Sequence, residues 1–394
     1  MKRQKYSSVS EETSMSTSTY STGNTTMVQN GGNLSITYRE LNVEENFDIV
    51  KTLAEGCFAK LILVKKNLDK MVLKAVHCEL TSGENFTREM NYNYFLSPHQ
   101  NIVTSFNVSF FWNNCYVYVQ EYAPYGDLSR FVKKGGLPES QVKLIAKQLC
   151  SAIEFIHSVH LVHRDLKLEN VLVFKPNFSL VKLCDFGYTR LEGTLVTKTN
   201  QTWIPFAPPE ICQVVHLERY YCHSSSDVWQ VGIILCVCLT GTSPWHCADI
   251  PDPIYRQYTD WHRRKSLRMP EKFKPFTPRL TRLLKRLLEP KPSKRSSICE
   301  VSKYLKDDWI RRGLTTAGSN NSRILLERRE STSTAARHSH KLSKQGTDSR
   351  ASSKTRGGKF SQIYGLEMDV DKKLLSERVV DWIASSSSSS SGSV

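Results

Sequence analysis

LVHRDLKLENVLVF (residues 161–174) and VKLCDFGYTR (residues 181–190) are the stretches that decide the fold of this chain. The first contains HRD, ending at Asp165, and then Asn170; the second contains DFG, beginning at Asp185. Phosphoryl transfer needs a carboxylate beside the acceptor hydroxyl and two oxygen donors that hold Mg²⁺ near the γ-phosphate. Asp165 matches the first requirement, and Asn170 and Asp185 match the second. The ordered motifs, each flanked by apolar strand-like residues, predict a phosphoryl-transfer site rather than two unrelated turns beside buried strands.

Size and charge narrow the class of protein. The 394 residues are 39% hydrophobic, enough for one large two-lobed domain with tails or for two small domains. The formal net charge of +16 is compatible with nucleic acid, anionic lipid or an acidic partner. No aromatic and basic stripe or nucleic-acid motif accompanies the charge, so we expect basic tails and no nucleic-acid partner. A nucleic-acid-binding module is the alternative that rests on charge alone.

Cysteine usage and hydropathy indicate the compartment. Eleven cysteines are scattered without Cys-x-x-Cys spacing. The apolar run VGIILCVCLTG, residues 231–241, is too short to span a bilayer and predicts a buried core helix. The N-terminal MKRQKYSSVS lacks the apolar segment of a secretory signal. Free thiols without a signal or a transmembrane segment indicate a reducing compartment, the cytoplasm or the nucleus.

Composition separates two tails from a core. Residues 1–44 are rich in Ser, Thr, Asn and Gly, and residues 313–394 are Ser-rich and basic. Neither buries enough apolar surface to offset the entropy of ordering, so we expect both to be disordered. One short helix is expected at 365–384, where apolar residues recur at helical spacing. It either docks on the folded domain or a partner, or fluctuates without one.

The core reads as two unlike halves. Strands dominate residues 45–125, apart from the helical stretch NFTREMNYNYFL at 85–96. From 126 to 312 apolar residues recur at helical spacing, as in QVKLIAKQLCSAIEFIHSV and PRLTRLLKRLLE. A small strand-rich lobe ahead of a larger helical lobe predicts an α+β, bilobal fold.

With these motifs, residues 46–312 resemble the eukaryotic protein kinase domain. Within that family, the segments QEYAPYGDL, DFGYTR and LTGTSPW are similar to the SH3-domain-binding serine/threonine kinases. The likeness covers the kinase domain only. Because no proline follows Pro292, SH3 binding is not carried over to this chain.

The resemblance implies that LAEGCFAKL is the loop whose backbone N–H groups cover the phosphates of ATP. Only the central glycine is kept. Alanines stand at two positions where glycines are usual, and a methyl group there restricts positive φ. The implied ATP-binding residues of this loop are Leu53, Ala54, Glu55, Gly56, Cys57, Phe58, Ala59, Lys60 and Leu61.

Beyond the loop, the resemblance implies a lysine–glutamate pair. Lys74 in MVLK matches the lysine that contacts the α and β phosphates, and Glu89 matches the helix glutamate that positions it. Glu84 is the alternative partner. Val72 replaces the usual alanine and should narrow the adenine pocket, and Asn93 stands where an apolar residue is usual, one turn after the glutamate.

In VYVQEYAPYGDL, main-chain groups of Glu121 and Ala123 are expected to bind adenine. Gln120 would guard the pocket behind it. Asp127 could accept a hydrogen bond from a ribose hydroxyl, or simply be an acid favoured at a helix N-terminus.

The catalytic and activation segments carry further expectations. Lys167 matches the lysine that contacts the transferred phosphate and marks serine/threonine-specific kinases. Arg164 suggests a positive socket for a phosphothreonine of the activation segment, with Thr197, Thr199 and Thr202 as candidates.

Three residues are expected to be scaffold: Glu210 paired with Arg295, and Asp227 bracing the catalytic loop. Cys57 and Cys184 lie near the phosphates, and we expect inert packing thiols rather than redox-sensitive ones.

Together these features predict a monomeric kinase that uses ATP and Mg²⁺ to phosphorylate Ser or Thr hydroxyls of protein substrates. Ala54, Ala59 and Asn93 motivate the alternative, a pseudokinase scaffold with a weakened phosphate loop. The sequence does not identify the substrate.

Overall fold

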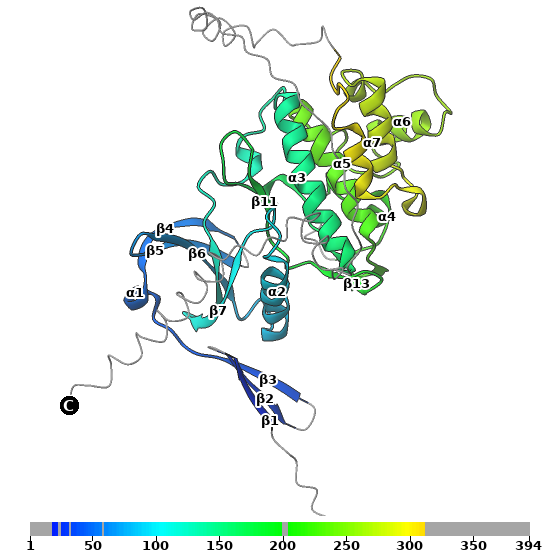
Figure 1. Cartoon of the computed structure of the whole chain (residues 1–394). Helices are drawn as coiled ribbons and strands as arrows, with labels where there is room; N and C mark the ends of the chain where they lie inside the picture. The colour runs from blue at the N-terminus through cyan, green and yellow to red at the C-terminus, as the bar shows by residue number, and fades with distance from the viewer. Residues whose placement is uncertain (1–17, 23–24, 31–32, 57–58, 199–203, 312–394) are drawn as a thin grey trace, which may run out of the picture.

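The computed structural model describes residues 18–22, 25–30, 33–56, 59–198 and 204–311, and these form a strand-rich lobe and a helical lobe (Figure 1). The expected α+β, bilobal fold is confirmed. The tail beyond residue 311, with the helix predicted at 365–384, lies outside the described residues.

The smaller lobe is built on a five-stranded antiparallel sheet of order β4-β5-β6-β8-β7. Alternation along β6 places Met71, Leu73 and Ala75 in the core of the lobe. The intervening Val72 and Lys74 face the opposite side, because successive side chains of a strand point to opposite faces. The strands are β4 (Asp48–Glu55), β5 (Ala59–Lys66), β6 (Asp69–His77), β7 (Ser105–Trp112) and β8 (Cys115–Glu121).

Helix α2 (Gly83–Leu96) confirms the helical stretch predicted within this lobe. The Ser82 side chain caps it by accepting from the backbone N–H of Asn85. Phe86 and Met90 pack against β8 in a small apolar cluster. This packing turns the face that carries Glu89 toward β6.

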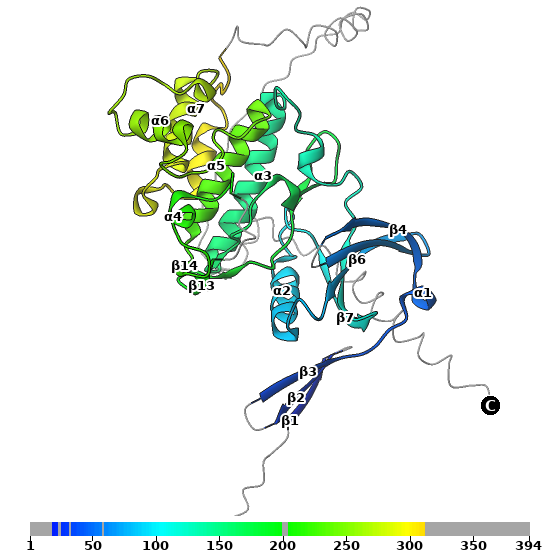
Figure 2. The same cartoon turned by 180° about the vertical axis from the view of Figure 1, so that it is seen from behind.

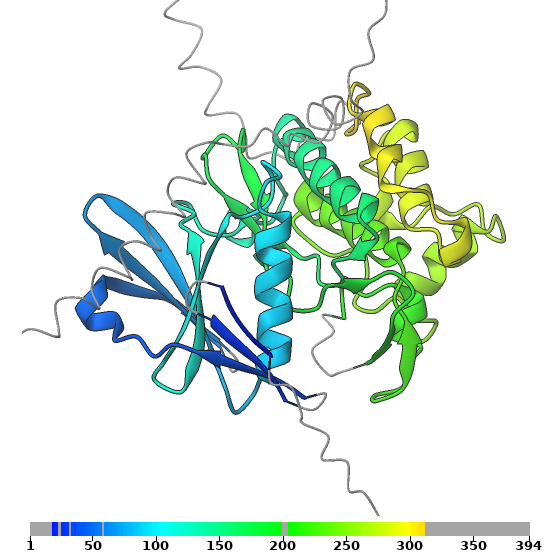
Figure 3. The same cartoon turned by 60° about the horizontal axis from the view of Figure 1, so that its bottom comes forward.

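The chain ahead of the sheet differs from the expected disorder. Three antiparallel strands form within the segment predicted to be disordered, and Leu41 and Val43 are buried in the core of the smaller lobe. Ser- and Thr-rich alternation around Gly-Asn and Gly-Gly pairs is a hairpin signal that low apolar content obscured. The end of β3 reaches α2, where the ring of Tyr38 packs edge-on against Phe86 (Figure 3). The elements are β1 (Ser18–Thr22), β2 (Thr25–Asn30), β3 (Asn33–Tyr38) and α1 (Val43–Asn46).

Helices α3, α5 and α7 lie side by side in the larger lobe (Figures 1 and 2). The apolar run at 231–241 forms the second half of α5 up to Thr240, with Gly241 as the C-cap, and α5 is almost wholly buried, so the predicted core helix is confirmed. Gly232 permits its close contact with α7, because a Cβ there would lie 2.7 Å from Cδ2 of Leu288. The helices are α3 (Glu139–Ser158), α4 (Pro209–Cys212), α5 (Ser224–Thr240), α6 (Pro253–His262) and α7 (Pro278–Leu287). Among the described helices, none is long and apolar enough to cross a membrane.

Short strands and 3-10 turns complete the larger lobe, and β12 and β13 lie in the activation segment. The strands are β9 (Leu161–Val162), β10 (Val171–Val173), β11 (Val181–Leu183), β12 (Arg190–Leu191), β13 (Leu195–Thr197) and β14 (Arg219–Tyr221). The 3-10 turns are η1 (Leu128–Arg130), η2 (Leu168–Asn170), η3 (Glu271–Phe273), η4 (Pro292–Lys294) and η5 (Ile298–Tyr304).

The antiparallel pairing of β10 with β11 positions the site. Val171 pairs with Leu183, so the start of β10 lies beside the end of β11. Asn170 immediately precedes the first and Asp185 closely follows the second. A local strand pair thus brings two motifs that are separated in sequence to one place.

Candidate active site

A cleft of about 830 Å³ lies between the lobes. Most of the predicted ATP and metal residues line it: Leu53, Ala54, Gly56, Ala59, Leu61, Lys74, Glu89, Glu121, Ala123, Asp127, Asn170 and Asp185. Glu55 and Lys60 pair with each other at 3.4 Å and are not among the lining residues. Cys57 and Phe58 lie outside the described residues.

Lys74 is held by two carboxylates. Its Nζ lies 2.7 Å from Oε1 of Glu89 and 3.0 Å from Oδ1 of Asp185. Burial would lower the pKa of Lys74, but the charges of Asp185 and Glu89 outweigh it and raise the pKa well above its usual value. Glu84 is exposed, so the helix partner of the lysine is Glu89 and not the alternative.

Asp185 adopts a left-handed backbone conformation, with φ of 67°. Such a conformation is uncommon outside glycine, although aspartate tolerates it better than most residues, and it persists only where the surroundings enforce it. Burial would raise the pKa of Asp185, but the charge and hydrogen bond of Lys74 hold it below the usual value. The carboxylate is therefore ionised and faces the cleft.

Asn170 lines the cleft, whereas Asp165 lies beside it and lines a second, smaller pocket. Oδ2 of Asp165 accepts from Nζ of Lys167 at 2.7 Å and from Nδ2 of Asn170 at 3.0 Å. Nδ2 of Asn170 also donates to the main-chain oxygen of Asp165 at 2.7 Å. The amide nitrogen is thus committed to Asp165, which leaves Oδ1 of Asn170 as its oxygen donor.

His163 joins the two motifs. Its Nδ1 lies 3.3 Å from the backbone N–H of Asp165, and its Nε2 lies 3.2 Å from the main-chain oxygen of Cys184. The first contact needs an acceptor and the second a donor, so the ring is protonated on Nε2. Burial lowers the pKa of His163 and keeps it neutral. Burial also raises the pKa of the Cys184 thiol, which agrees with an inert packing role.

Asp227 holds the backbone of the catalytic loop by hydrogen bonds. Its carboxylate accepts from the backbone N–H groups of His163 at 2.9 Å and Arg164 at 2.8 Å, and from His157 at 2.9 Å. Burial would raise the pKa of Asp227, but the His157 hydrogen bond and these donors lower it. Gln230 adds two hydrogen bonds, from the N–H of Leu166 and to the oxygen of Arg164.

Residues 47–310 match the family model described as protein kinase domain. The chain belongs to the protein kinase family. It is 40% identical over 353 residues to the serine/threonine-protein kinase meng-po of Drosophila melanogaster. The aligned region covers 86% of this chain and 74% of that relative.

Two further relatives are serine/threonine-protein kinases named SBK1. The one from Danio rerio is 34% identical over 289 residues, covering 73% of this chain and 74% of its own. The one from Mus musculus is 37% identical over 270 residues, covering 68% of this chain and 64% of its own. The predicted likeness to the SH3-domain-binding serine/threonine kinases is confirmed, and the chain is an ATP-dependent protein serine/threonine kinase.

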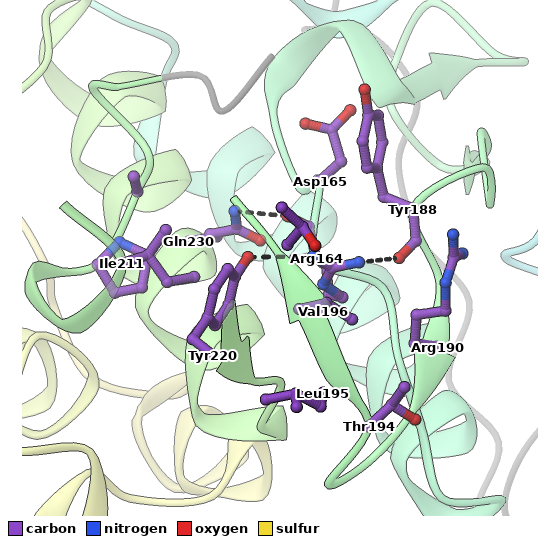
Figure 4. Close-up of a pocket in the computed structure, with 13 residues that line it drawn as sticks. Arg164, Asp165, Tyr188, Arg190, Thr194, Leu195, Val196, Ile211, Tyr220 and Gln230 are labelled. Carbon is purple, nitrogen blue, oxygen red and sulfur yellow. Dashed lines mark hydrogen bonds between the residues drawn. The ribbon is translucent and has the colours of Figure 1, made fainter. Parts of the chain in front are cut away.

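A second pocket of this kinase, of about 320 Å³, lies beside the cleft (Figure 4). The guanidinium of Arg164 donates to the main-chain oxygen of Tyr188 at 2.9 Å and to the hydroxyl of Tyr220 at 3.0 Å. Its buried Nε has no partner among the residues that the structure describes. Burial and the charges of Arg88 and Arg164 lower the pKa of Arg190, which also lines the pocket, to about 10. The crowded cations make this pocket attractive to an anion.

Thr197 lines the same pocket. Thr199 and Thr202 lie outside the described residues.

The predicted scaffold pair is present. Arg295, whose side chain is fully buried, donates to both oxygens of Glu210 at 2.7 and 2.9 Å. This two-point ion pair anchors the segment that follows the activation loop to the larger lobe.

Asp127 has the structural contacts of a helix cap. Its Oδ1 accepts from the backbone N–H of Ser129 at 3.1 Å, and its Oδ2 lies 2.9 Å from Nε of Arg130.

The backbone N–H of Glu121 donates to the main-chain oxygen of Thr104, so this N–H is not the main-chain group that would bind adenine.

Two residues of the site lay outside the predicted set. Lys182 Nζ lies 2.5 Å from Oε1 of Glu121, and the hydroxyl of Tyr118 donates to Oε1 of Glu89 at 2.8 Å. In the sequence each looks like an ordinary strand residue. The strand register, which places Tyr118 opposite Lys74, is visible only in the structure.

Proposed function

We propose that Asp165 orients the acceptor hydroxyl, that Lys167 offsets charge on the transferred phosphate, and that Lys74 and Glu89 position ATP. The convergence of Lys74, Glu89 and Asp185 in one cleft carries this proposal. Positioning and charge stabilisation account for most of the catalysis in phosphoryl transfer, and each of these groups supplies one of them.

We also propose that Asn170 and Asp185 hold Mg²⁺. The donor chemistry fits, because an amide oxygen and an ionised carboxylate are hard oxygen ligands, and Mg²⁺ usually takes only one or two protein ligands besides phosphate and water. Among the described residues there is no cluster of three or more His, Cys, Asp or Glu suited to a metal. When bound, the metal neutralises charge on the phosphates.

The test is Asp165→Asn in the full chain. Radiolabel transfer from ATP to a generic protein acceptor should fall about 10²- to 10⁴-fold, the usual contribution of a positioned base. The dissociation constant for nucleotide should stay within about threefold, because Asp165 is not among the residues that line the larger cleft. Unchanged turnover would remove the proposed role of Asp165. A wild-type chain that binds nucleotide without transfer would favour the pseudokinase scaffold.

We propose that phosphorylation of the activation segment completes the site. The socket of Arg164 and Arg190 supports this, since a phosphothreonine would bring negative charge and three acceptors to it. Thr197 is the described candidate at the pocket.

We further propose a monomeric enzyme of the cytoplasm or nucleus. Its molar mass by light scattering should equal that of one chain, and a concentration-dependent doubling would contradict the monomer. Imaging of the tagged chain in cells tests the compartment.

A further inference from the structure

Behind the cleft, this kinase has a buried polar cluster where apolar packing was expected. Tyr118 on β8 and Asn93 on α2 are both fully buried. The hydroxyl of Tyr118 donates to Oε1 of Glu89 at 2.8 Å, and Nδ2 of Asn93 lies 3.4 Å from that hydroxyl oxygen. The carboxylate that positions Lys74 is therefore bound by two donors on neighbouring strands, Lys74 and Tyr118.

Asn93 extends the cluster across the helix–sheet boundary. Its Nδ2 also donates to the main-chain oxygen of Glu89 at 2.8 Å, one turn earlier on α2. Its Oδ1 accepts from Nε2 of Gln120 at 3.3 Å, and that same nitrogen lies 3.4 Å from Oγ of Ser105. A continuous set of hydrogen bonds thus runs from α2 to strands β8 and β7.

The proton of the Tyr118 hydroxyl determines the direction of its two hydrogen bonds. Burial, and next the charge of Glu89, raise the pKa of Tyr118 well above its usual value, so its hydroxyl keeps its proton. The hydroxyl therefore donates to Glu89, and its oxygen accepts from the amide of Asn93.

We propose that Tyr118 is a positioning residue for ATP. Through Glu89, and with Asn93 as its second contact, it holds α2 where Lys74 meets the nucleotide. This inference rests on the proposed role of the Lys74–Glu89 pair. The polar cluster holds α2 against the sheet by hydrogen bonds, as an apolar residue at position 93 would hold it by packing. A satisfied polar cluster that only stabilises the fold is the competing explanation.

The decisive variant is Tyr118→Phe in the full chain, which keeps the ring and removes one hydroxyl. We expect kcat/KM for ATP and the affinity for a fluorescent nucleotide analogue to fall about tenfold, as for the loss of one hydrogen bond to a charged group. The matched control is Tyr116→Phe, the same change two residues away on β8, where the ring packs on Phe86 and Phe111 instead. It should stay within about twofold of the wild type.

A double-mutant cycle separates positioning from stability. If Tyr118 acts through Glu89, Tyr118→Phe should have almost no further effect on kcat/KM in a Glu89→Gln background. An equal loss in both backgrounds, or a lowered melting temperature with unchanged kcat/KM, would overturn the proposal. Should Tyr118→Phe unfold, Asn93→Ala takes its place, because it removes these hydrogen bonds without supplying an apolar side chain that packs. It should lower nucleotide affinity about threefold and couple to Glu89→Gln; additive effects would again refute the proposal.

Measurements of nucleotide affinity distinguish the positioning role of Tyr118 from the catalytic role proposed for Asp165. Unchanged turnover of Asp165→Asn would disprove the proposed role of Asp165. The double-mutant cycle of Tyr118 and Glu89 would still test the positioning of ATP. A Lys74→Met variant with unchanged nucleotide affinity would remove the premise on which the Tyr118 proposal rests.

Discussion

Lys182 and Glu121 tie the two lobes together beside the cleft, which Glu121 lines. Nζ of Lys182, on β11 of the larger lobe, lies 2.5 Å from Oε1 of Glu121, at the end of β8. The lysine side chain is 6% exposed and lies 4.7 Å from the centroid of the Phe174 ring. A buried cation with one carboxylate partner makes the segment between the lobes sensitive to either residue.

Lys182→Met should destabilise the kinase by about 3 kcal/mol, because it leaves Glu121 partly buried without its cation. Urea unfolding at neutral pH measures this change. Replacing both residues, as Lys182→Met with Glu121→Gln, should recover most of the loss. A single variant as stable as the wild type would show that the pair contributes nothing.

Asp227→Asn should destabilise the fold in a pH-dependent way. Because the folded pKa of Asp227 lies below its usual 3.8, its contribution is complete at pH above about 4 and is lost as the pH falls below that value. We expect a loss of about 3–5 kcal/mol at pH 7, as for a broken buried pair. Urea unfolding at pH 7, 5 and 3 should show an equal gap between variant and wild type at pH 7 and 5 and a smaller gap at pH 3. A gap that is constant across this range would contradict the assignment.

Gly232→Ala should cost about 1–3 kcal/mol by overpacking the contact between α5 and α7. The added Cβ would lie 2.7 Å from Cδ2 of Leu288 and 3.2 Å from Cβ of Leu287. Gly83→Ala is the matched control, since its nearest contact would be 3.4 Å, to the hydroxyl of Tyr116. Thermal unfolding of both variants measures the difference, and equal melting temperatures would argue against tight packing at Gly232.

Arg164→Gln should abolish the response to activation-segment phosphorylation. The ratio of activity before and after phosphatase treatment should fall from about tenfold or more toward one, because the socket loses its central cation. Phosphosite mapping identifies which threonine carries the phosphate. Full activity in a preparation without phosphate on the segment would refute the mechanism.

Local sequence patterns were enough to predict the two lobes, the core helix α5 and most of the cleft. Alternation in MVLKAVH determines which face of β6 carries Lys74, and helical spacing predicts α2 and α3. The N-terminal strands were missed because Ser and Thr replace the large apolar residues on which such predictions depend. Pairing between backbones does not require those residues.

The sequence by itself determined the kinase fold and most of the residues that line the cleft, since short motifs at given spacing carry both. Only the tertiary structure decided which partners those residues take. Glu89 rather than Glu84 reaches Lys74, Lys182 meets Glu121, and Tyr118 donates to Glu89. These contacts depend on how α2, β8 and β11 pack in space, and hydrogen bonds form only where packing brings donor and acceptor within about 3 Å.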